Sequence, residues 1–184
     1  MAVDYGPLTG FIGVWTGDQG VDVAPEPDED ERSSYYERLV FEPAGDVDNA
    51  DSQVLVMLRY NQTVMRKRND EVFHNEAGFL SWDAERALVM QSFAIPRGLA
   101  LVAGGTLEIA DGIVSISVQA TSGDDQWSIS QAPFLAEQAR TSRFARSYRL
   151  DRDTLTYDQL TSLEIYGRDV AHTDTNVLKR SQSE

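Results

Sequence analysis

Residues 107–120 read LEIADGIVSISVQA, and this stretch decides the fold class. Apolar and polar side chains alternate on both sides of Asp111-Gly112, a pair that is typical of the tight turn of a β-hairpin. In the second arm, Val114, Ile116 and Val118 share one face and the polar residues between them share the other, as in a half-buried strand. The stretch therefore predicts two antiparallel strands.

Similar short runs recur along the chain, separated by turn signals rich in Gly, Asp and Asn. They cover residues 35–41, 54–60, 78–82, 87–93, 98–103, 105–110, 126–130, 141–150 and 155–163, with Gly104-Gly105 read as a turn. Without βαβ crossovers, consecutive strands must stack as a sandwich or close into a barrel, and closure removes exposed strand edges. We therefore predict an all-β fold, a single antiparallel up-and-down β-barrel of about ten strands.

Helices and loops are a minor part of this prediction. Residues 133–140 read as one short helix, and residues 20–30 as a possible second one that Pro25 and Pro27 argue against. Residues 25–31 (PEPDEDE) predict a solvated loop, because the ligand pattern of a calcium loop is absent. Residues 44–52 predict another polar loop, and residues 181–184 a disordered tail. With no linker in the sequence, we expect residues 1–184 to form one domain with its core at about 8–180.

Charge and composition exclude several functional classes. The chain has 30 acidic and 16 basic side chains, and a net charge of −14 repels nucleic acid and anionic membrane surfaces. It has no Cys, which excludes disulfides, zinc–thiolate sites, iron–sulfur clusters and a Cys nucleophile. No apolar stretch is long enough to span a bilayer, and residues 1–10 lack the basic start of a secretory signal. We therefore expect a cytoplasmic protein.

Imidazole chemistry is confined to His74 and His172, the only two histidines. Their spacing alone identifies neither as a metal ligand. The sequence has no nucleophile elbow, P-loop, dinucleotide fingerprint or zinc-protease motif. The basic cluster at residues 66–68 is open to two interpretations, a site that neutralises a ligand's carboxylates or a charged strand end. Aromatic side chains inside a barrel either fill it or surround one small ligand.

Three segments carry a family resemblance. Residues 8–17 (LTGFIGVWTG) open the chain, residues 74–80 (HNEAGFL) lie in its middle and residues 172–180 (HTDTNVLKR) close it. With these segments the chain resembles the nitrobindins, haem-binding ten-stranded β-barrels of the calycin group. Three positions depart from the family pattern, since Gln19 precedes the expected glycine, now Gly20, and Thr173 and Thr175 replace apolar residues. A shift by one residue would put Thr173 at the ligand position.

The resemblance implies a cofactor and a chemistry. It implies ferric haem b held by His172 as the proximal iron ligand, with His74 on the distal side as the catalytic residue. Trp15 and Phe73 are expected among the side chains around the cofactor. The family binds nitric oxide and isomerises peroxynitrite to nitrate, so the same is expected here.

Two alternatives stay open from the sequence. One is a non-catalytic carrier of a fatty acid or another small hydrophobic ligand, in which Arg66 or Arg143 would pair with a carboxylate. The other is a barrel filled by its own side chains. A homodimer is also compatible with the sequence.

Overall fold

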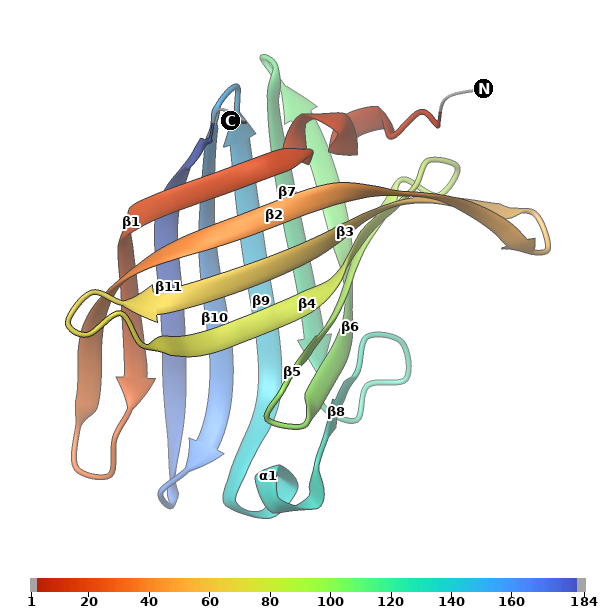
Figure 1. Ribbon diagram of the computed structural model, residues 1–184. Helices are drawn as coiled ribbons and strands as arrows, with labels where there is room; N and C mark the ends of the chain where they lie inside the picture. The colour runs from red at the N-terminus through yellow and green to blue at the C-terminus, as the bar shows by residue number, and fades with distance from the viewer. Residues whose placement is uncertain (1–2, 182–184) are drawn as a thin grey trace.

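Closure of a single sheet defines the architecture (Figure 1). The computed structural model describes residues 3–181, so residues 182–184 of the predicted tail lie outside the described range. The wall strands are β1 (Gly13–Pro25), β2 (Asp30–Ala50), β3 (Gln53–Arg66), β4 (Val72–Asp83), β5 (Leu88–Ile95), β6 (Leu99–Ala110), β7 (Ile113–Thr121), β9 (Ala139–Asp151), β10 (Thr154–Ile165) and β11 (Arg168–Arg180). Each pairs antiparallel with the next, and β11 pairs with β1. The predicted up-and-down barrel of ten strands is confirmed.

Three short elements complete the described chain. A 3-10 helix, η1 (Gly6–Phe11), precedes β1, and a short strand, β8 (Ile129–Gln131), pairs with β6. The helix α1 (Pro133–Gln138) confirms the helix predicted at 133–140, although residues 139 and 140 belong to β9. The second helix considered at residues 20–30 is wrong, because β1 continues to Pro25. No turn signal interrupts the chain before Pro25, and β1 continues to that residue.

Two glycine pairs that look alike in the sequence play different roles. Asp111 and Gly112 have φ angles of 53° and 78° and turn the chain between β6 and β7, as predicted. Gly104 and Gly105 lie inside β6, so the turn predicted there is wrong. A Cβ on Gly104 would lie 2.3 Å from the Trp127 ring. The pair therefore permits close packing against the strand rather than a change of direction.

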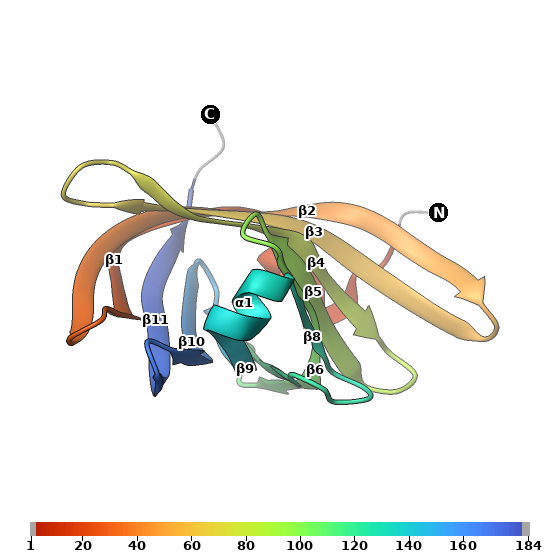
Figure 2. The ribbon, with the colours of Figure 1, turned by 90° about the horizontal axis from the view of Figure 1, so that it is seen from below.

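One of the two predicted polar loops is mainly strand, and the other keeps a short connection. β2 runs through residues 44–50, and its hairpin with β3 extends beyond the barrel as an arm (Figures 1 and 2). The prediction of a loop over 44–52 is therefore wrong except for the turn at residues 51–52. In the acidic segment, β1 and β2 leave only the exposed residues 26–29 as a connection. Polar composition indicated exposure correctly in both places, but strand pairing decided the backbone conformation.

The barrel has two unlike ends. At one end, which we call the closed end, η1 and the neighbouring strands supply the buried side chains Leu8, Phe11, Trp15, Phe41 and Leu150. The ring of Phe11 packs edge-on against Phe41 at 5.7 Å. At the other end, the open end, α1 lies across part of the barrel (Figure 2). Among the described residues, no helix has the length and hydrophobicity to cross a membrane.

Candidate functional site

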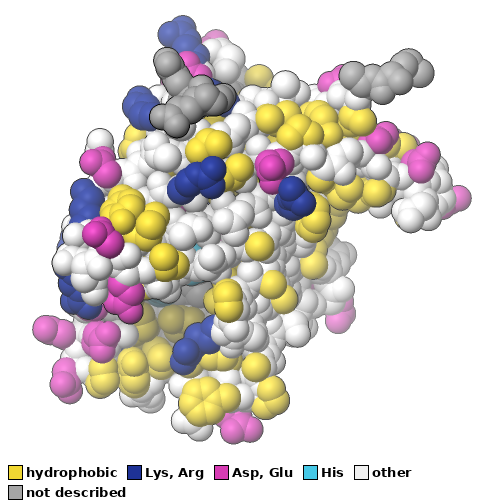
Figure 3. Space-filling model, in the orientation of Figure 1, with side chains coloured by type: hydrophobic (Ala, Val, Ile, Leu, Met, Phe, Trp, Pro, Cys, Tyr) yellow, Lys and Arg dark blue, Asp and Glu magenta, His cyan; other side chains and the backbone are white. Residues whose placement is uncertain are grey.

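A cavity of about 270 Å³ lies at the open end, where the space-filling view is hollowed (Figure 3). One part of its lining is apolar and includes Phe73, Phe93, Ile95, Leu99, Leu101 and Phe144. Another part is polar and ionisable and includes Asp22, His74, Glu76, Arg146, His172 and Asp174. A pocket that combines an apolar wall with a few convergent polar groups is the usual form of a small-ligand site.

His172 reaches this cavity because of the alternation in β11. His172 and Asp174 line the cavity, and Asn176 and Leu178 continue the same inward face as buried residues. Thr173, on the opposite face, does not line it. The one-residue shift considered from the sequence is thus not adopted, and His172 is the inward imidazole of this strand.

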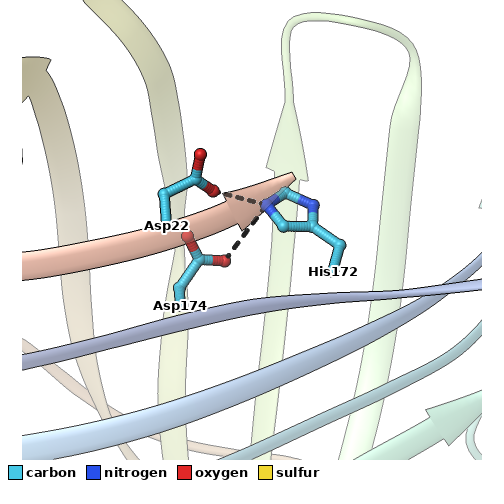
Figure 4. A group of neighbouring side chains, drawn as sticks. All are labelled: Asp22, His172 and Asp174. Atoms are coloured by element: carbon cyan, nitrogen blue, oxygen red, sulfur yellow. Dashed lines mark hydrogen bonds and ion pairs between the residues drawn. The ribbon is translucent and has the colours of Figure 1, made fainter. Parts of the chain in front are cut away.

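His172 is held by two carboxylates (Figure 4). Its Nε2 donates a hydrogen bond to Asp22 Oδ1 at 2.6 Å, and Asp174 Oδ2 lies 3.7 Å from the same nitrogen. Burial lowers the pKa of His172, but the bond to Asp22 and the charges of both carboxylates outweigh burial and raise it. Burial, supported by the neighbouring charge of Asp22, raises the pKa of Asp174 to about 6. These three residues form a compact group of oxygen and nitrogen donors.

An irregularity in β1 turns Asp22 inward. The register of β1 with β11 shifts by one residue between Thr16 and Val21, which marks a bulge. Before it Trp15 faces the core, and after it Gly20 and Asp22 do. A Cβ on Gly20 would lie 2.2 Å from the ring of Tyr35, so glycine is needed where this ring packs. The bulge accounts for the glycine that stands at position 20 instead of 19.

His74 enters the cavity from the opposite part of the wall. It lies on β4, whose pairing with β5 covers only Ala77 to Asp83. Residues 72–76 therefore have no strand partner on that side within the described chain, and the cavity continues there to Ile95 and Arg97. His74 Nε2 lies 3.5 Å from Glu76 Oε2. The side chains of His74 and His172 are both partly exposed to the cavity, at 30% and 27%.

A buried ion pair forms the floor of the cavity. Arg146 donates to both carboxylate oxygens of Glu76, at 2.7 and 3.1 Å, and both side chains are at most 2% exposed. Burial raises the pKa of Glu76, but the charge of Arg146 and the contacts with Arg146 and His74 together outweigh burial and lower the pKa to about 2. Tyr60 donates to Glu76 at 2.5 Å, and Arg146 donates to Tyr148 at 3.0 Å and to Gln159. We call Tyr60, Glu76, Gln91, Arg146 and Tyr148 the middle layer.

A second polar group lies beside the cavity. Glu37 is 2% exposed and accepts hydrogen bonds from Gln62 at 2.6 Å and Asn176 at 2.7 Å. Burial raises the pKa of this carboxyl. The hydroxyls of Tyr35 and Tyr157 share a hydrogen bond of 2.6 Å, and Tyr157 lines the cavity with Gln62. The barrel interior therefore contains a network of hydrogen-bonded polar side chains, which an interior filled only by apolar side chains would lack.

The predicted site residues divide into two groups. His172, His74 and Phe73 line the same cavity. Trp15 does not line it: the ring is fully buried, donates to Phe11 O at 2.7 Å and lies under the guanidinium of Arg180. Trp15 is therefore a core residue near the closed end.

The arginines suggested for a carrier function lie elsewhere. Arg66 stacks over the Phe73 ring at 4.4 Å and stands 3.8 Å from Glu31. Arg143 is exposed on the outer face of β9 and donates to Gln119. The arginine inside the barrel is Arg146, which the sequence analysis did not single out. Its position between Phe144 and Tyr148, both on the inward face of β9, was the available signal.

Comparison with known proteins places this geometry in a family. The model of the THAP4-like, heme-binding beta-barrel domain matches residues 4–180, nearly the whole chain. The chain belongs to this family of heme-binding barrels. No curated protein matches the sequence. Among solved structures, Rv2717c from M. tuberculosis is similar with a TM-score of 0.74 and 22% identity, over 97% of this chain and 100% of that one. At this identity the likeness concerns the fold.

The cavity can be tested against the group that the family name implies. An imidazole enters from each of two walls, and aromatic and aliphatic side chains cover the rest. Imidazole is an ordinary axial ligand of haem iron, and an apolar surrounding suits the porphyrin. The donor types therefore fit haem. The volume lies just below the ~300–1,000 Å³ of typical ligand pockets, and the mouth beside residues 72–76 lets a larger ligand extend outward.

Proposed function

We propose that this chain binds ferric haem b in the open-end cavity, with His172 as the iron ligand and His74 facing the opposite side of the cofactor. One observation carries the proposal: the only two histidines of the chain, on β4 and β11, line one cavity although β1, β2 and β3 separate these strands around the wall. Two imidazoles on facing walls suit a flat metal macrocycle between them.

The chemistry follows from what this cavity offers to a bound group. Ferric haem would supply a coordination position that binds nitric oxide and that polarises peroxynitrite as a Lewis acid, so that nitrate forms. His74 would donate a hydrogen bond to the small ligand, and Glu76 holds a carboxylate 3.5 Å from the ring. Phe73, next to His74 on the lining, limits access of water. The net charge of −14 slows the approach of an anion, so binding of neutral nitric oxide is favoured over fast turnover of peroxynitrite.

The carrier alternative has less support from the geometry. A fatty-acid carboxylate inside a barrel needs a cation that is free to pair with it. Arg146 is already paired with both oxygens of Glu76 and donates to Gln159 and Tyr148. The other arginine among the described lining residues is Arg97, which is exposed, so the interior of the cavity presents no unpaired arginine to a carboxylate.

A hemin titration followed by visible spectroscopy tests the proposal. The wild-type protein should give a saturable Soret band at one equivalent, His172→Ala should lose the spectrum of a histidine-ligated iron, and His74→Ala should keep it. Nitric oxide should then shift the band of the loaded wild-type protein. A Soret band that His172→Ala leaves unchanged would contradict the proposed ligand.

Peroxynitrite decay measured by stopped flow tests the catalytic part. Loaded wild-type protein should accelerate the conversion to nitrate, and His74→Ala should be slower while it binds equal amounts of hemin. If peroxynitrite decays at the same rate with either loaded protein as in buffer alone, the protein is a haem or nitric oxide binder and the isomerase part of the proposal is wrong. Displacement of a fluorescent fatty acid from the haem-free protein tests the carrier alternative.

A further inference from the structure

The two ring nitrogens of His172 are not equivalent toward a flat cofactor. Nδ1 adjoins the ring carbon that carries the side chain, so the Cβ atom crowds a porphyrin that approaches it. Nε2 is at the far edge of the ring and can reach a metal at the centre of a macrocycle. In this structure Nε2 is the nitrogen that donates to Asp22 at 2.6 Å.

The opposite arrangement is the usual one at metal sites. A histidine that binds a metal typically gives its other nitrogen to a carboxylate, which fixes the ring and leaves the ligating nitrogen free. Here the carboxylate of Asp22 stands at the nitrogen that the iron requires. An Asp22 that merely oriented the ring for iron would have to lie at Nδ1 instead.

We propose that Asp22 is a latch on the haem site: its carboxylate competes with iron for Nε2 of His172, and haem binds only when this contact opens. The inference rests on the proposed function, because it concerns the iron ligand named there. In this role Asp22 opposes iron binding by His172, whereas a residue that oriented the ring would promote it.

The position of the latch is set by the backbone. Asp22 faces Asp174 directly across the β1–β11 pair, and His172 is the next inward residue of β11. Like charges directly opposite each other repel, and the imidazole N–H between them offsets this repulsion. Asp22 is 2% exposed, so water cannot easily replace His172 as its partner. These contacts hold the closed latch in place.

A further residue, Gln159, fixes the position of Asp174. Gln159 donates to Asp174 Oδ2 at 3.0 Å and accepts from Arg146 Nε at 2.8 Å. Asp174 is therefore tied to the middle layer through Gln159. Asp22 has no such tie among the hydrogen bonds of the described chain, where His172 is its side-chain partner. The contact between Asp22 and His172 can therefore open without breaking the bond between Gln159 and Asp174.

Hemin titrations of charge-neutral variants test the latch. Asp22→Asn keeps the size and removes the charge, so the charge-assisted hydrogen bond becomes a weaker neutral one and hemin affinity should rise about tenfold. Asp22→Ala should act in the same direction. Asp158→Asn, an exposed carboxylate on the neighbouring strand β10, is the matched control and should leave the affinity unchanged. Melting curves of the haem-free variants establish that each is folded.

Nuclear magnetic resonance gives a readout that needs no haem. With only two histidines, a nitrogen-15 spectrum of the imidazoles contains two sets of signals, which His172→Ala and His74→Ala assign. The wild-type protein should show a hydrogen-bonded Nε2 proton on His172, and Asp22→Ala, which removes the acceptor, should lose it. A His172 whose Nε2 carries no such proton in the wild-type protein overturns the latch.

The outcomes separate the latch from the proposed function. Equal or weaker hemin binding by Asp22→Asn overturns the latch and leaves haem binding standing. Tighter binding by Asp22→Asn that also depends on His172 supports both. Absence of a histidine-ligated spectrum in the wild-type protein and in Asp22→Asn contradicts the proposed function itself, whatever the resonance experiment shows.

Discussion

The closed end and the open end of the barrel are made by the same strands but are completed in opposite ways. At the closed end η1 inserts Leu8 and Phe11, and the interior is filled with fully buried apolar side chains. At the open end α1 contributes Leu135 to a wall that leaves a cavity of about 270 Å³. One end gains stability from close packing, and the other gives up part of that packing to leave room for a ligand.

The middle layer separates the two ends. It places the ionised pair Glu76 and Arg146 between the apolar packing and the cavity, with Tyr60, Tyr148 and Gln91 around it. A buried pair of this kind stabilises little by itself, but removal of one partner leaves the other charge unpaired. The members of the cavity floor therefore depend on each other, and variants can break this layer at defined points.

The largest effect is expected from the middle layer. Arg146→Met leaves Glu76 buried without its cation, and the free energy of unfolding should fall by about 5 kcal/mol, the upper end for a broken buried pair. Arg143→Met, on the exposed face of the same strand, should change it by less than about 0.5 kcal/mol. Urea denaturation measures both. A loss below about 1 kcal/mol for Arg146→Met would show that Glu76 finds another partner.

Two phenylalanines sharpen the contrast between the ends. Phe11→Ala removes a fully buried ring from the closed end and should cost about 4 kcal/mol. Phe73→Ala, at the partly exposed cavity wall, should cost much less but weaken hemin binding. Thermal unfolding and hemin titration on the same samples make the comparison. Equal destabilisation by both variants would mean that the open end is packed as tightly as the closed one.

Acid should weaken the middle layer through Glu76. Its pKa of about 2 in the folded protein is below the ordinary value of 4.5, so the unfolded chain binds this proton first. The contribution, about 3 kcal/mol, is complete above pH 4.5 and is lost as the pH falls toward 2. Unfolding free energies of the wild-type protein should decline over this window more steeply than those of Glu76→Gln. Glu42→Gln, an exposed control, should retain the wild-type slope.

The smallest effect is expected from a single hydroxyl beside the cavity. Tyr35→Phe removes the hydrogen bond to Tyr157 and should cost about 1 kcal/mol. The adjacent Tyr36 points outward and bonds to the exposed Asp70, so Tyr36→Phe should be nearly neutral. Chemical denaturation of the two variants measures both changes in the free energy of unfolding. A larger loss for Tyr36→Phe would contradict the assignment of inward and outward faces on β2.

Alternation of side chains was enough to predict the strands, because period-two patterns report directly on the two faces of a strand, and the need to cover strand edges then favoured a barrel. The same rule could have found Arg146, which stands at an inward position of β9. It could not have found Asp22, since the bulge in β1 reverses the inward and outward faces before that residue. The turn predicted at Gly104-Gly105 was wrong because a glycine that accommodates a neighbouring ring looks the same in the sequence as one that turns the chain.

The two histidines show what a family resemblance adds. Their spacing in the sequence gave no reason to bring them together, and the resemblance predicted that they flank one site. Both line the cavity. Trp15, predicted by the same resemblance, packs in the core instead, because the first strand carries its aromatic residue to the closed end. A sequence motif therefore identifies a strand more securely than it identifies which side chains of that strand line the cavity.

The pairing of β1 with β11 has a consequence for how the protein folds. Every other wall pairing joins strands that are neighbours or near neighbours along the chain, so hairpins can form locally and early. The seam between β1 and β11 joins the two ends of the barrel sequence and carries the greatest loss of chain entropy. Asp22, His172 and Asp174 all lie on this seam. The site therefore exists only when this seam has formed, and a ligand bound there would favour the closed barrel over the open sheet.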